Sequence, residues 1–456
     1  MAAPEIQNGD QSVGFQLHLV IVGAGLAGLA AAISARLEGH RVTLLERADQ
    51  LVEVGAGLQV TPNATRLFHR WGVFDELRSK AAVPSYLAVR RYDGSRLLAY
   101  EDRFQEKIIQ SYDAPFWDLH RADLQLALVH RAQSLGVNIR LGADVAEVDP
   151  QRIIVTTKSG ERVQGDLILG ADGLWSRTRN VLVQPPLMPK PTGDLAYRII
   201  LDLEDIKDPE LQKLVSNPSV NFWVGPHSHV VGYSVRQGRT YNLVLLRPDD
   251  LPKDVPRASA NVEEMRSLFE NWDPTWVEHP YARLSTTNRN NIAAYLFTLK
   301  QCGIGCISDA FLRLVSTLDT WANSEGTFLL AGDACHPMLP YLAQGANSSL
   351  EDGAVLGRLL KYVTSREKLP SALEMYQQLR KSRGETIAKE ALEQRASFHM
   401  EDGPLQEERD AIFLENLGKV PDCQFPSRWT CPSVQPWLYG YDAVAEADKA
   451  YKAHPF

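Results

Sequence analysis

The stretch LHLVIVGAGLAGLAAAISARLEGHRVTLLER, from Leu17 to Arg47, places a glycine-rich turn directly after a short apolar run. That run, Leu17 to Val22, is typical of a buried parallel strand, and Ala27 to Leu37 has the propensity of a helix. A second apolar segment then ends at Glu46. The order strand, tight turn, helix and strand predicts an α/β domain of the Rossmann type.

The turn itself contains Gly23, Gly25 and Gly28 in the pattern G-x-G-x-x-G. The first glycine permits the turn, the second lets a diphosphate approach the backbone, and the third lets helix and strand pack closely. The free N–H groups and the positive dipole at the helix start favour phosphates. Glu46 stands where an acid receives the adenosine ribose hydroxyls, and it disfavours a 2′-phosphate. The motif therefore predicts FAD or NAD binding and does not separate the two.

Later segments indicate how this domain is completed. From about Pro185 the sequence changes to alternating, aromatic-rich strands typical of an antiparallel sheet, and an apolar strand returns at GTFLLAGDA. An NAD dehydrogenase normally completes its nucleotide-binding domain in one stretch, whereas this return comes about 300 residues after the glycine turn, which favours FAD. The predicted divisions are a loose lead over 1–14, an FAD-binding domain over 15–184 and 325–371, a substrate domain over 185–285, an atypical insertion over 286–310, a return segment over 311–324, and a helical C-terminal region with a Pro-rich tail over 372–456.

The overall composition excludes several classes of partner. The 456 residues carry a net charge of −8, and Lys and Arg are scattered, so we expect no nucleic-acid partner. The apolar stretch near the N-terminus lacks a basic lead and is interrupted by three glycines, so we expect neither a signal peptide nor a membrane span. Five cysteines without paired spacing favour a reducing compartment. We therefore predict a cytoplasmic protein that acts on small molecules.

Three motifs in order carry a family resemblance: GAGLAG at 23–28, GADGLWS at 170–176 and GDACHPMLPYLAQGANSSLEDG at 332–353. From about Leu17 to Arg380 the chain resembles the single-component FAD-dependent aromatic hydroxylases of the para-hydroxybenzoate hydroxylase fold, especially the salicylate and 3-hydroxybenzoate hydroxylase branch. The resemblance implies a Rossmann-type FAD-binding domain, an inserted, mostly antiparallel β substrate domain and a helical C-terminal tail. It also implies FAD as cofactor, with O2 and a transiently bound NAD(P)H as co-substrates.

The resemblance further implies roles for matching positions. The first glycine turn and the acid at Glu46 would hold the adenosine half of FAD. The remaining implied cofactor positions are Arg121 at the diphosphate, Asp333 at the ribityl chain, Gly57 and Gln59 beside the flavin, and Asp172 with Gly173 in a motif associated with both FAD and the nicotinamide donor. Arg121 opens a predicted helix, where a cation opposes the dipole, so its side chain either makes a surface salt bridge or reaches into the ligand cleft.

The third motif also predicts local structure. Ser348 and Glu351 form an S-x-x-E capping box, which predicts a helix that starts around residue 349. The preceding Gly345, Ala346 and Asn347 can then aim backbone N–H groups and a positive helix dipole at the flavin pyrimidine edge, where reduction deposits negative charge.

Three side chains of the middle domain are candidates for the reaction. A phenol becomes a better nucleophile when it is ionised, so a nearby cation, hydroxyl or imidazole should stabilise or create its phenolate. His229 and Tyr233 are four residues apart on a predicted strand and share a face, and Arg198 is a lone charge among apolar residues. Alternatives stay open: Arg198 on a solvent face, Tyr233 as core packing, and His229 in a turn. His336, in the third motif, either touches substrate or oxygen or makes a structural hydrogen bond.

These features predict an NAD(P)H-dependent FAD monooxygenase that hydroxylates a phenolic or related aromatic compound through a flavin C4a-hydroperoxide. One alternative is hydroxylating dearomatisation or epoxidation of a larger natural product. Another is a flavin dehydrogenase or oxidase, or a flavin-binding protein whose active site has decayed. The segment from Thr286 to Ala310 departs from the family's pattern, and we interpret it as a surface insertion or an unspliced translated segment.

Overall fold

The computed structural model describes residues 15–51, 56–207, 209–249, 269, 272, 308–314, 317–421 and 425–456. The predicted lead over 1–14 and residues 286–307 of the predicted insertion lie outside the described residues. The last three residues of that predicted insertion, 308–310, begin strand β16.

A five-stranded sheet carries the first glycine turn. Its strands follow the order β17 (Phe328–Leu330), β11 (Leu167–Gly170), β1 (His18–Val22), β2 (Arg41–Leu45) and β7 (Asn138–Arg140). All neighbours in this sheet are parallel. The apolar runs of β1, β11 and β17 are almost completely buried, as expected for a parallel sheet covered on both faces. The Rossmann-type prediction is confirmed, and the late return strand β17 lies at one edge of this sheet.

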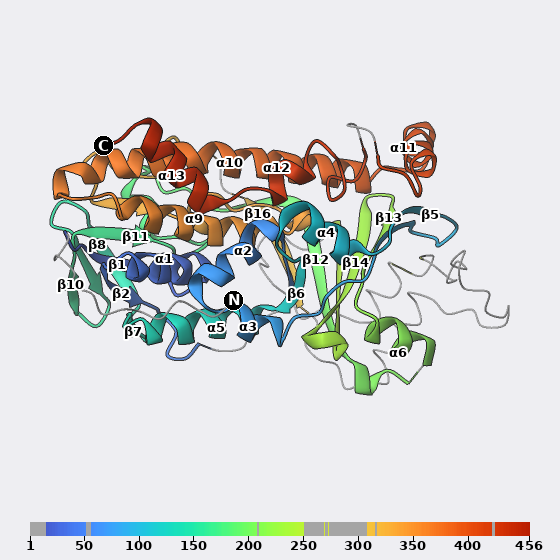
Figure 1. The fold of residues 1–456 in the computed structure, drawn as a ribbon, viewed down its shortest axis with the longest axis horizontal. Helices are drawn as coiled ribbons and strands as arrows, with labels where there is room; N and C mark the ends of the chain where they lie inside the picture. The colour runs from blue at the N-terminus through green and yellow to red at the C-terminus, as the bar shows by residue number, and fades with distance from the viewer. Residues whose placement is uncertain are drawn as a thin grey trace.

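Two helices run side by side over this sheet, α1 (Leu26–Leu37) and α9 (Gln344–Leu360) (Figure 1). A Cβ atom on Gly353 would lie 2.4 Å from the backbone nitrogen of Ala31, and one on Gly357 would lie 2.3 Å from the Cβ of Ser34. Only glycine permits this close approach. The contacts advance in the same direction along both helices, so α1 and α9 are parallel. Their N-termini therefore face the same end of the sheet.

A seven-stranded sheet forms the second part of the molecule, at the right in Figure 1. Its order is β16 (Ser308–Leu314), β12 (Lys190–Asp202), β15 (Thr240–Pro248), β14 (Ser228–Val235), β13 (Val220–Gly225), β4 (Leu87–Arg91) and β5 (Leu97–Glu101). All pairs are antiparallel except β13 with β4. The expectation of a mostly antiparallel second sheet is confirmed, although β4 and β5 come from chain before residue 185.

The C-terminal helices connect the two sheets. The longest, α10 (Leu369–Phe398), lies along the upper side of the molecule in Figure 1. Near its start the Tyr376 hydroxyl donates to the carbonyl of Leu330 in β17, and directly after its end the His399 ring contacts His229 in β14. Beyond it lie α11 (Pro404–Glu415), α12 (Gln435–Tyr439) and α13 (Ala443–Ala453). One helix thus spans from the five-stranded sheet to the seven-stranded sheet.

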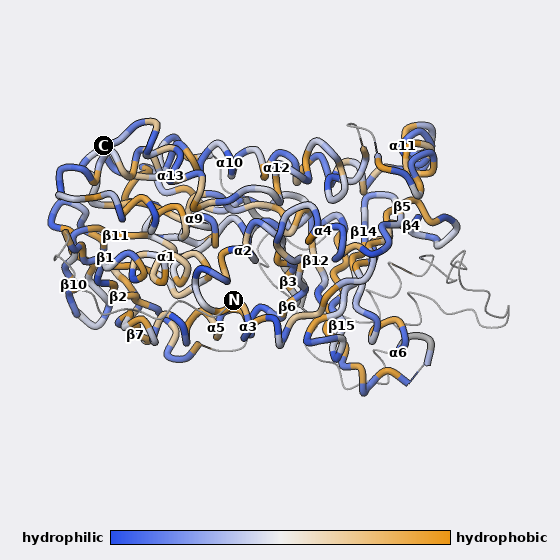
Figure 2. The backbone as a smooth tube through the Cα atoms, viewed as in Figure 1, coloured by the Kyte–Doolittle hydropathy of each residue, from blue (hydrophilic) through white to orange (hydrophobic). Residues whose placement is uncertain are grey.

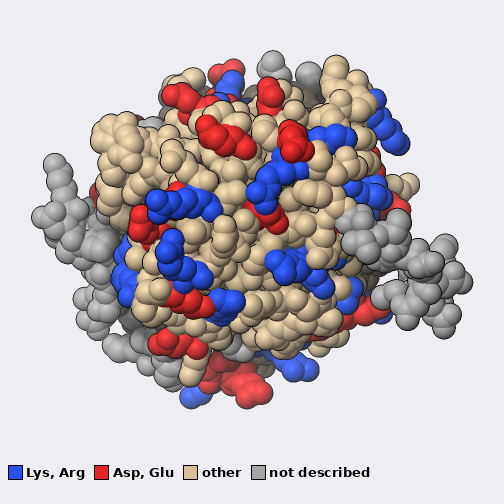
Figure 3. All heavy atoms as spheres, turned by 90° about the vertical axis from the view of Figure 1, so that its left-hand side faces the viewer, with Lys and Arg blue, Asp and Glu red and all other residues tan. Residues whose placement is uncertain are grey.

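Shorter elements fill the space between and around the sheets. These are β3 (Gly57–Val60), α2 (Pro62–Trp71), α3 (Phe74–Arg78), α4 (Phe104–Tyr112), β6 (Trp117–His120), α5 (Arg121–Ser134), β8 (Val145–Asp149), β9 (Ile154–Thr157), β10 (Arg162–Gln164) and α6 (Pro209–Ser216). Figure 2 shows apolar residues gathered along the strands of both sheets and on α1. On the face shown in Figure 3, acidic and basic side chains are interspersed. No helix of the described chain is both long and apolar enough to cross a bilayer.

We call the third motif, at 332–353, the second glycine loop. The predicted start of its helix is wrong. Helix α9 begins at Gln344, after Ala343 in the left-handed region with φ 52°, so Ser348 and Glu351 lie inside the helix and form no capping box. The carboxylate of Glu351 instead binds Arg383 of α10 at 2.8 Å. The Glu351 side chain, which the local pattern assigned to a helix cap, therefore pairs with an arginine of α10. Local spacing cannot anticipate that contact.

Candidate active site

A cavity of about 280 Å³ lies where the two sheets meet. Its cofactor half, as we name the walls near the five-stranded sheet, is formed by Gly25, Leu26, Ala27, Gly57, Leu58, Gln59, Arg121, Ala171, Gly173, Asp333, Gly345, Ala346 and Ser349. Its substrate half is formed by Arg198, Phe222, His229, Val231, Tyr233, Val244, Leu246, Met338, Pro340, Tyr341, Ala343 and Trp429. Both glycine loops, far apart in the sequence, therefore face one space.

The three glycines of the first turn have different surroundings. Gly23 has φ +106°, and a Cβ there would lie 2.4 Å from the carbonyl oxygen of Ala171. A Cβ on Gly28 would lie 2.0 Å from the carbonyl oxygen of Gly23. Around Gly25, by contrast, an added Cβ meets nothing within 4 Å. Gly23 and Gly28 thus serve close packing, while Gly25 borders the open room that a diphosphate at a helix N-terminus requires.

Two predicted acidic ligands are held by the protein's own backbone. The Glu46 carboxylate accepts from the backbone N–H groups of Ala24 at 2.9 Å and Ala48 at 3.0 Å, and it does not line the cavity. The Asp172 carboxylate accepts from the Ser176 hydroxyl at 2.6 Å and from the backbone N–H of Arg177 at 2.8 Å.

Glu46 therefore touches the first glycine turn itself, whereas Asp172 stabilises its own loop. The neighbours of Asp172 in that loop, Ala171 and Gly173, reach the cavity.

The start of α9 forms the opposite wall. Gly345 and Ala346 line the cavity, and a Cβ on Gly345 would contact only Cγ of Met338, at 3.8 Å. Asn347 does not line the cavity; its side chain accepts from the backbone N–H of Thr61 at 3.1 Å and donates to the carbonyl of Gln59 at 3.0 Å. The first turn of α9 therefore borders the cavity, and Asn347 connects β3 to this helix.

Arg121 and Asp333 both line the cavity, Arg121 at the start of α5 and Asp333 in the turn after β17. Among the described residues no carboxylate lies within ion-pair distance of Arg121, which lines the cavity at the start of α5. Its predicted alternative, a surface salt bridge, is not found in this part of the chain. The Asp333 side chain is accessible from the cavity but otherwise enclosed by protein, and this burial raises its pKa, while His336 and Arg121 oppose the shift.

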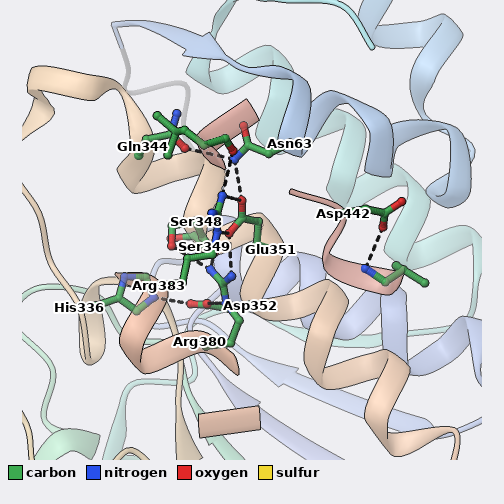
Figure 4. Close-up of polar contacts among 12 residues, drawn as sticks. Asn63, His336, Gln344, Ser348, Ser349, Glu351, Asp352, Arg380, Arg383 and Asp442 are labelled. Carbon is green, nitrogen blue, oxygen red and sulfur yellow. Dashed lines mark hydrogen bonds and ion pairs between the residues drawn. The ribbon is translucent and has the colours of Figure 1, made fainter. Parts of the chain in front are cut away.

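A buried network of charges supports the second glycine loop (Figure 4). Asp352 of α9 accepts from the backbone N–H of Gly332 at 2.8 Å, from His336 Nε2 at 2.5 Å and from Arg380 Nε at 2.7 Å. Burial opposes ionisation, but the charges of His336 and Arg380 hold the pKa of Asp352 at about 2. The His336 ring thus makes the structural contact that was one of its two predicted roles, and the network fixes the turn that carries Asp333.

The neighbouring Glu351 extends this network. Its carboxylate binds Arg383 at 2.8 Å and Arg380 at 2.7 Å, and it accepts from the side-chain amide of Asn63 at 2.6 Å (Figure 4). Asn63 lies in the first turn of α2, which follows β3. These contacts therefore join three elements behind the cofactor half: helix α10, the start of α2 and the N-terminal part of α9.

The three predicted reaction residues converge on the substrate half. Arg198 is half-buried on β12, and burial lowers the pKa of its guanidinium. No hydrogen bond or ion pair joins the Arg198 side chain to another described residue. Burial likewise raises the pKa of Tyr233, and Arg198 partly offsets that rise. His229 lies on the same face of β14 as Tyr233, and both line the cavity.

Gly57, which the resemblance placed beside the flavin, lines the cavity, whereas the lining residue Trp429 was not predicted from the sequence. Gly57 sits tightly against Tyr233 and Asn242, since its Cβ would lie 2.6 Å from Tyr233 Cε2, and its N–H donates to the Asn242 side chain at 3.0 Å. Trp429 comes from the C-terminal region and donates through Nε1 to the carbonyl of Tyr341 at 3.1 Å. No local pattern marks Trp429, since only the path of the tail brings it to the cavity.

Comparison with known proteins identifies the family. The model described as FAD binding domain matches residues 16–291 and 316–391. The chain belongs to the FAD-binding monooxygenase family. It is 53% identical over 438 residues, covering 95% of this chain and 97% of the relative, to the FAD-dependent monooxygenase OpS4 of Beauveria bassiana (strain ARSEF 2860). It is 28% identical to 3-hydroxybenzoate 6-hydroxylase of Polaromonas naphthalenivorans (strain CJ2), covering 93% of this chain and 96% of that protein.

The solved structure of a salicylate hydroxylase substrate complex has a similar fold, with a TM-score of 0.72 at 21% identity, covering 95% of this chain and 98% of that one. The family prediction, the FAD cofactor and the monooxygenase class are thereby confirmed, and NAD(P)H is typical of this family. The open room beside Gly25 and the two helix N-termini on one cavity fit this cofactor. The roles of individual site residues stay predictions.

Proposed function

We propose that this FAD-dependent monooxygenase hydroxylates a phenolic or related aromatic compound, with NAD(P)H as electron donor and O2 as oxygen source. One observation carries the proposal: Arg198, Tyr233 and His229 line the same cavity as the two glycine loops. The names of two similar proteins, a 3-hydroxybenzoate 6-hydroxylase and a salicylate hydroxylase, support the same substrate class.

The cofactor half supplies the positions at which FAD would be held. Gly25 and the N–H groups at the start of α1 would bind the diphosphate, with Arg121 adding a positive charge. Asp333 would accept from the ribityl hydroxyls, and the N–H groups of Gly345 and Ala346 would face the flavin ring. When bound and reduced, FAD supplies the chemistry that activates O2, and the surrounding residues position it and exclude water.

The substrate half would recognise the aromatic compound by shape and charge. Phe222, Tyr341 and Trp429 offer apolar surfaces suited to a flat ring. A half-buried guanidinium without a protein partner is costly, and a phenolate or carboxylate oxygen beside Arg198 would satisfy it. Arg198 would favour ionisation of the phenol, and ionisation raises the electron density of the ring carbon that accepts oxygen. Tyr233 would add a hydroxyl contact to the same substrate oxygen.

The test is a screen of purified enzyme against phenols, aromatic acids and larger aromatic natural products. We expect a yellow protein whose NAD(P)H oxidation is stimulated by part of the panel, with one ¹⁸O atom incorporated per product under ¹⁸O2. An unlabelled oxidised product would instead indicate a dehydrogenase or oxidase. A labelled product that has lost its aromatic ring would favour hydroxylating dearomatisation, which proton NMR of the product distinguishes.

A further inference from the structure

A second histidine lies behind His229 and was not singled out in the sequence. The Nδ1 atom of His229, on β14, lies 2.7 Å from the Nε2 atom of His399, which directly follows α10. Both side chains are almost completely buried, with 3% and 7% of their surface exposed. His229 lines the substrate half, whereas His399 does not. The pair thus joins the cavity to the C-terminal helix.

Both rings are neutral in this environment. Burial, followed by the repulsion of Arg395 and His227, lowers the pKa of His399 to about 3. Burial and the neighbouring His399 also lower the pKa of His229 well below its ordinary value, against a smaller opposing effect of Asp194. Each ring therefore carries one proton, and a hydrogen bond between them requires one donor and one acceptor.

The charged and titratable groups around the pair are largely neutralised by one another. Asp194 of β12 receives both Arg395 of α10, at 2.5 and 2.6 Å, and the hydroxyl of Tyr341 at 2.5 Å. His227, at the turn between β13 and β14, lies 3.1 Å from Glu401 at the surface. No carboxylate of the described chain contacts either ring of the pair.

Only two proton arrangements satisfy these conditions. In the first, His399 Nε2–H donates to His229 Nδ1, so His229 carries its own proton on Nε2. In the second, His229 Nδ1–H donates to His399 Nε2, so His399 must carry its proton on Nδ1. The His399 Nδ1 atom is buried and has no hydrogen-bond partner among the described residues. An orphaned buried N–H is rarer than an unsatisfied acceptor, and the positive charge of Arg395 also favours a bare nitrogen lone pair.

We infer that His399 holds His229 in the tautomer whose Nε2–H faces the cavity, so that His229 donates a hydrogen bond to the substrate and does not deprotonate it. The inference rests on the proposed function and narrows its substrate. Arg198 and the His229 N–H then face the same cavity as a cation and a donor, and a phenol would bind as its anion after losing its proton to solvent. His399 is a positioning residue, since it acts only through His229.

The test uses the FAD-loaded enzyme labelled with ¹⁵N in the histidine rings. We expect His229 to show a protonated Nε2 and an unprotonated Nδ1, with signals assigned by their loss in His229→Gln. A protonated Nδ1 on His229 would overturn the inference. This measurement needs no substrate, so it can fail or succeed independently of the proposed function.

Two variants of His399 sharpen the test. His399→Gln keeps an N–H donor near the position of Nε2 and should preserve the His229 tautomer. His399→Glu places an acceptor there and should move the His229 proton to Nδ1. With 4-nitrophenol as probe, equilibrium dialysis on both sides of its ionisation should show at least tenfold weaker binding of the anion to the Glu variant, with the Gln variant close to the parent enzyme.

Equal anion binding by the Gln and Glu variants would contradict the inference. If the Glu variant does not fold, as judged by its melting temperature, the ¹⁵N spectrum of the parent enzyme still decides the tautomer. A parent enzyme with the expected tautomer that binds no phenol would contradict the proposed function and leave the role of His399 in place.

Discussion

The two halves of the cavity are built in different ways. The cofactor half is made mostly of backbone, with glycine turns and two helix N-termini at the cavity, and carboxylates such as Glu46 and Asp352 behind them bind groups of the protein itself. The substrate half is made of side chains, and Arg198 reaches it without a protein partner in the described chain. The difference teaches that the cofactor half presents mainly backbone that buried side chains hold in place, while the substrate half presents mainly side chains to its ligand.

The largest expected effect tests the support of the cofactor half. Asp352→Asn removes the carboxylate that accepts hydrogen bonds from the buried Arg380 and His336. The free energy of unfolding should therefore fall by about 3 to 5 kcal/mol. Because the pKa of Asp352 is lowered to about 2, its stabilising effect should be present above about pH 4 and lost as pH falls towards 2. Denaturant unfolding at several pH values measures both.

A matched control for this variant is Asp75→Asn, which removes an exposed ion pair with Arg78. We expect its unfolding free energy to stay within about 0.5 kcal/mol of the parent protein. Equal losses in the two variants would show that the buried network has no special role.

The next effect separates ligand binding from folding within the glycine turn. Gly25→Leu should weaken FAD binding at least about a hundredfold, or about 2.8 kcal/mol, since each tenfold change in Kd corresponds to about 1.4 kcal/mol. Its backbone has φ −72° and its Cβ meets open space, so the melting temperature of the apoprotein should hardly change. Fluorescence titration with FAD and calorimetry measure the two quantities.

The comparison variant is Gly28→Leu, whose Cβ collides with the carbonyl of Gly23. We expect this variant to lose stability as well as FAD. If Gly25→Leu instead unfolds to the same extent, the assigned difference between the two glycines is wrong.

A smaller effect is expected in the substrate half. Arg198→Met removes a charge-assisted hydrogen bond to the substrate, which is worth about 1.5 to 3 kcal/mol, so kcat/KM should fall by about 10- to 150-fold. Because the guanidinium is half-buried and pairs with no side chain of the described residues, the melting temperature should stay the same or rise. Steady-state kinetics and thermal unfolding of the same samples test this, and a destabilised variant would identify Arg198 as structural.

The smallest effect concerns the neighbouring hydroxyl. Tyr233→Phe keeps the ring that packs on Gly57 and removes a neutral hydrogen bond worth about 0.5 to 1.5 kcal/mol. We expect kcat/KM to fall by about 2- to 13-fold with FAD affinity unchanged. Parent-like kinetics in this variant would mean that Tyr233 contributes only packing.

The two halves also differ in how far the sequence predicted them. The first glycine turn was predicted with its strand and helix because the φ angles and packing of that turn depend on residues within one short segment. The start of α9 was misplaced because Glu351 is bound by Arg383, over thirty residues later in the chain. His399 and Trp429 were missed, since a histidine after a helix and a tryptophan in a coil carry no local signal of a cavity.

By itself, the sequence determined the Rossmann-type turn, the late return strand, the mostly antiparallel second sheet and the flavin-binding class, because strand periodicity and glycine spacing are local properties of the chain. The tertiary structure decided which carboxylates bind groups of the protein itself, which cations face the cavity, and which histidine contacts His229 from behind. Those outcomes depend on burial and on partners from other elements of the chain, as when the end of α10 brings His399 against His229, 170 residues away in the sequence.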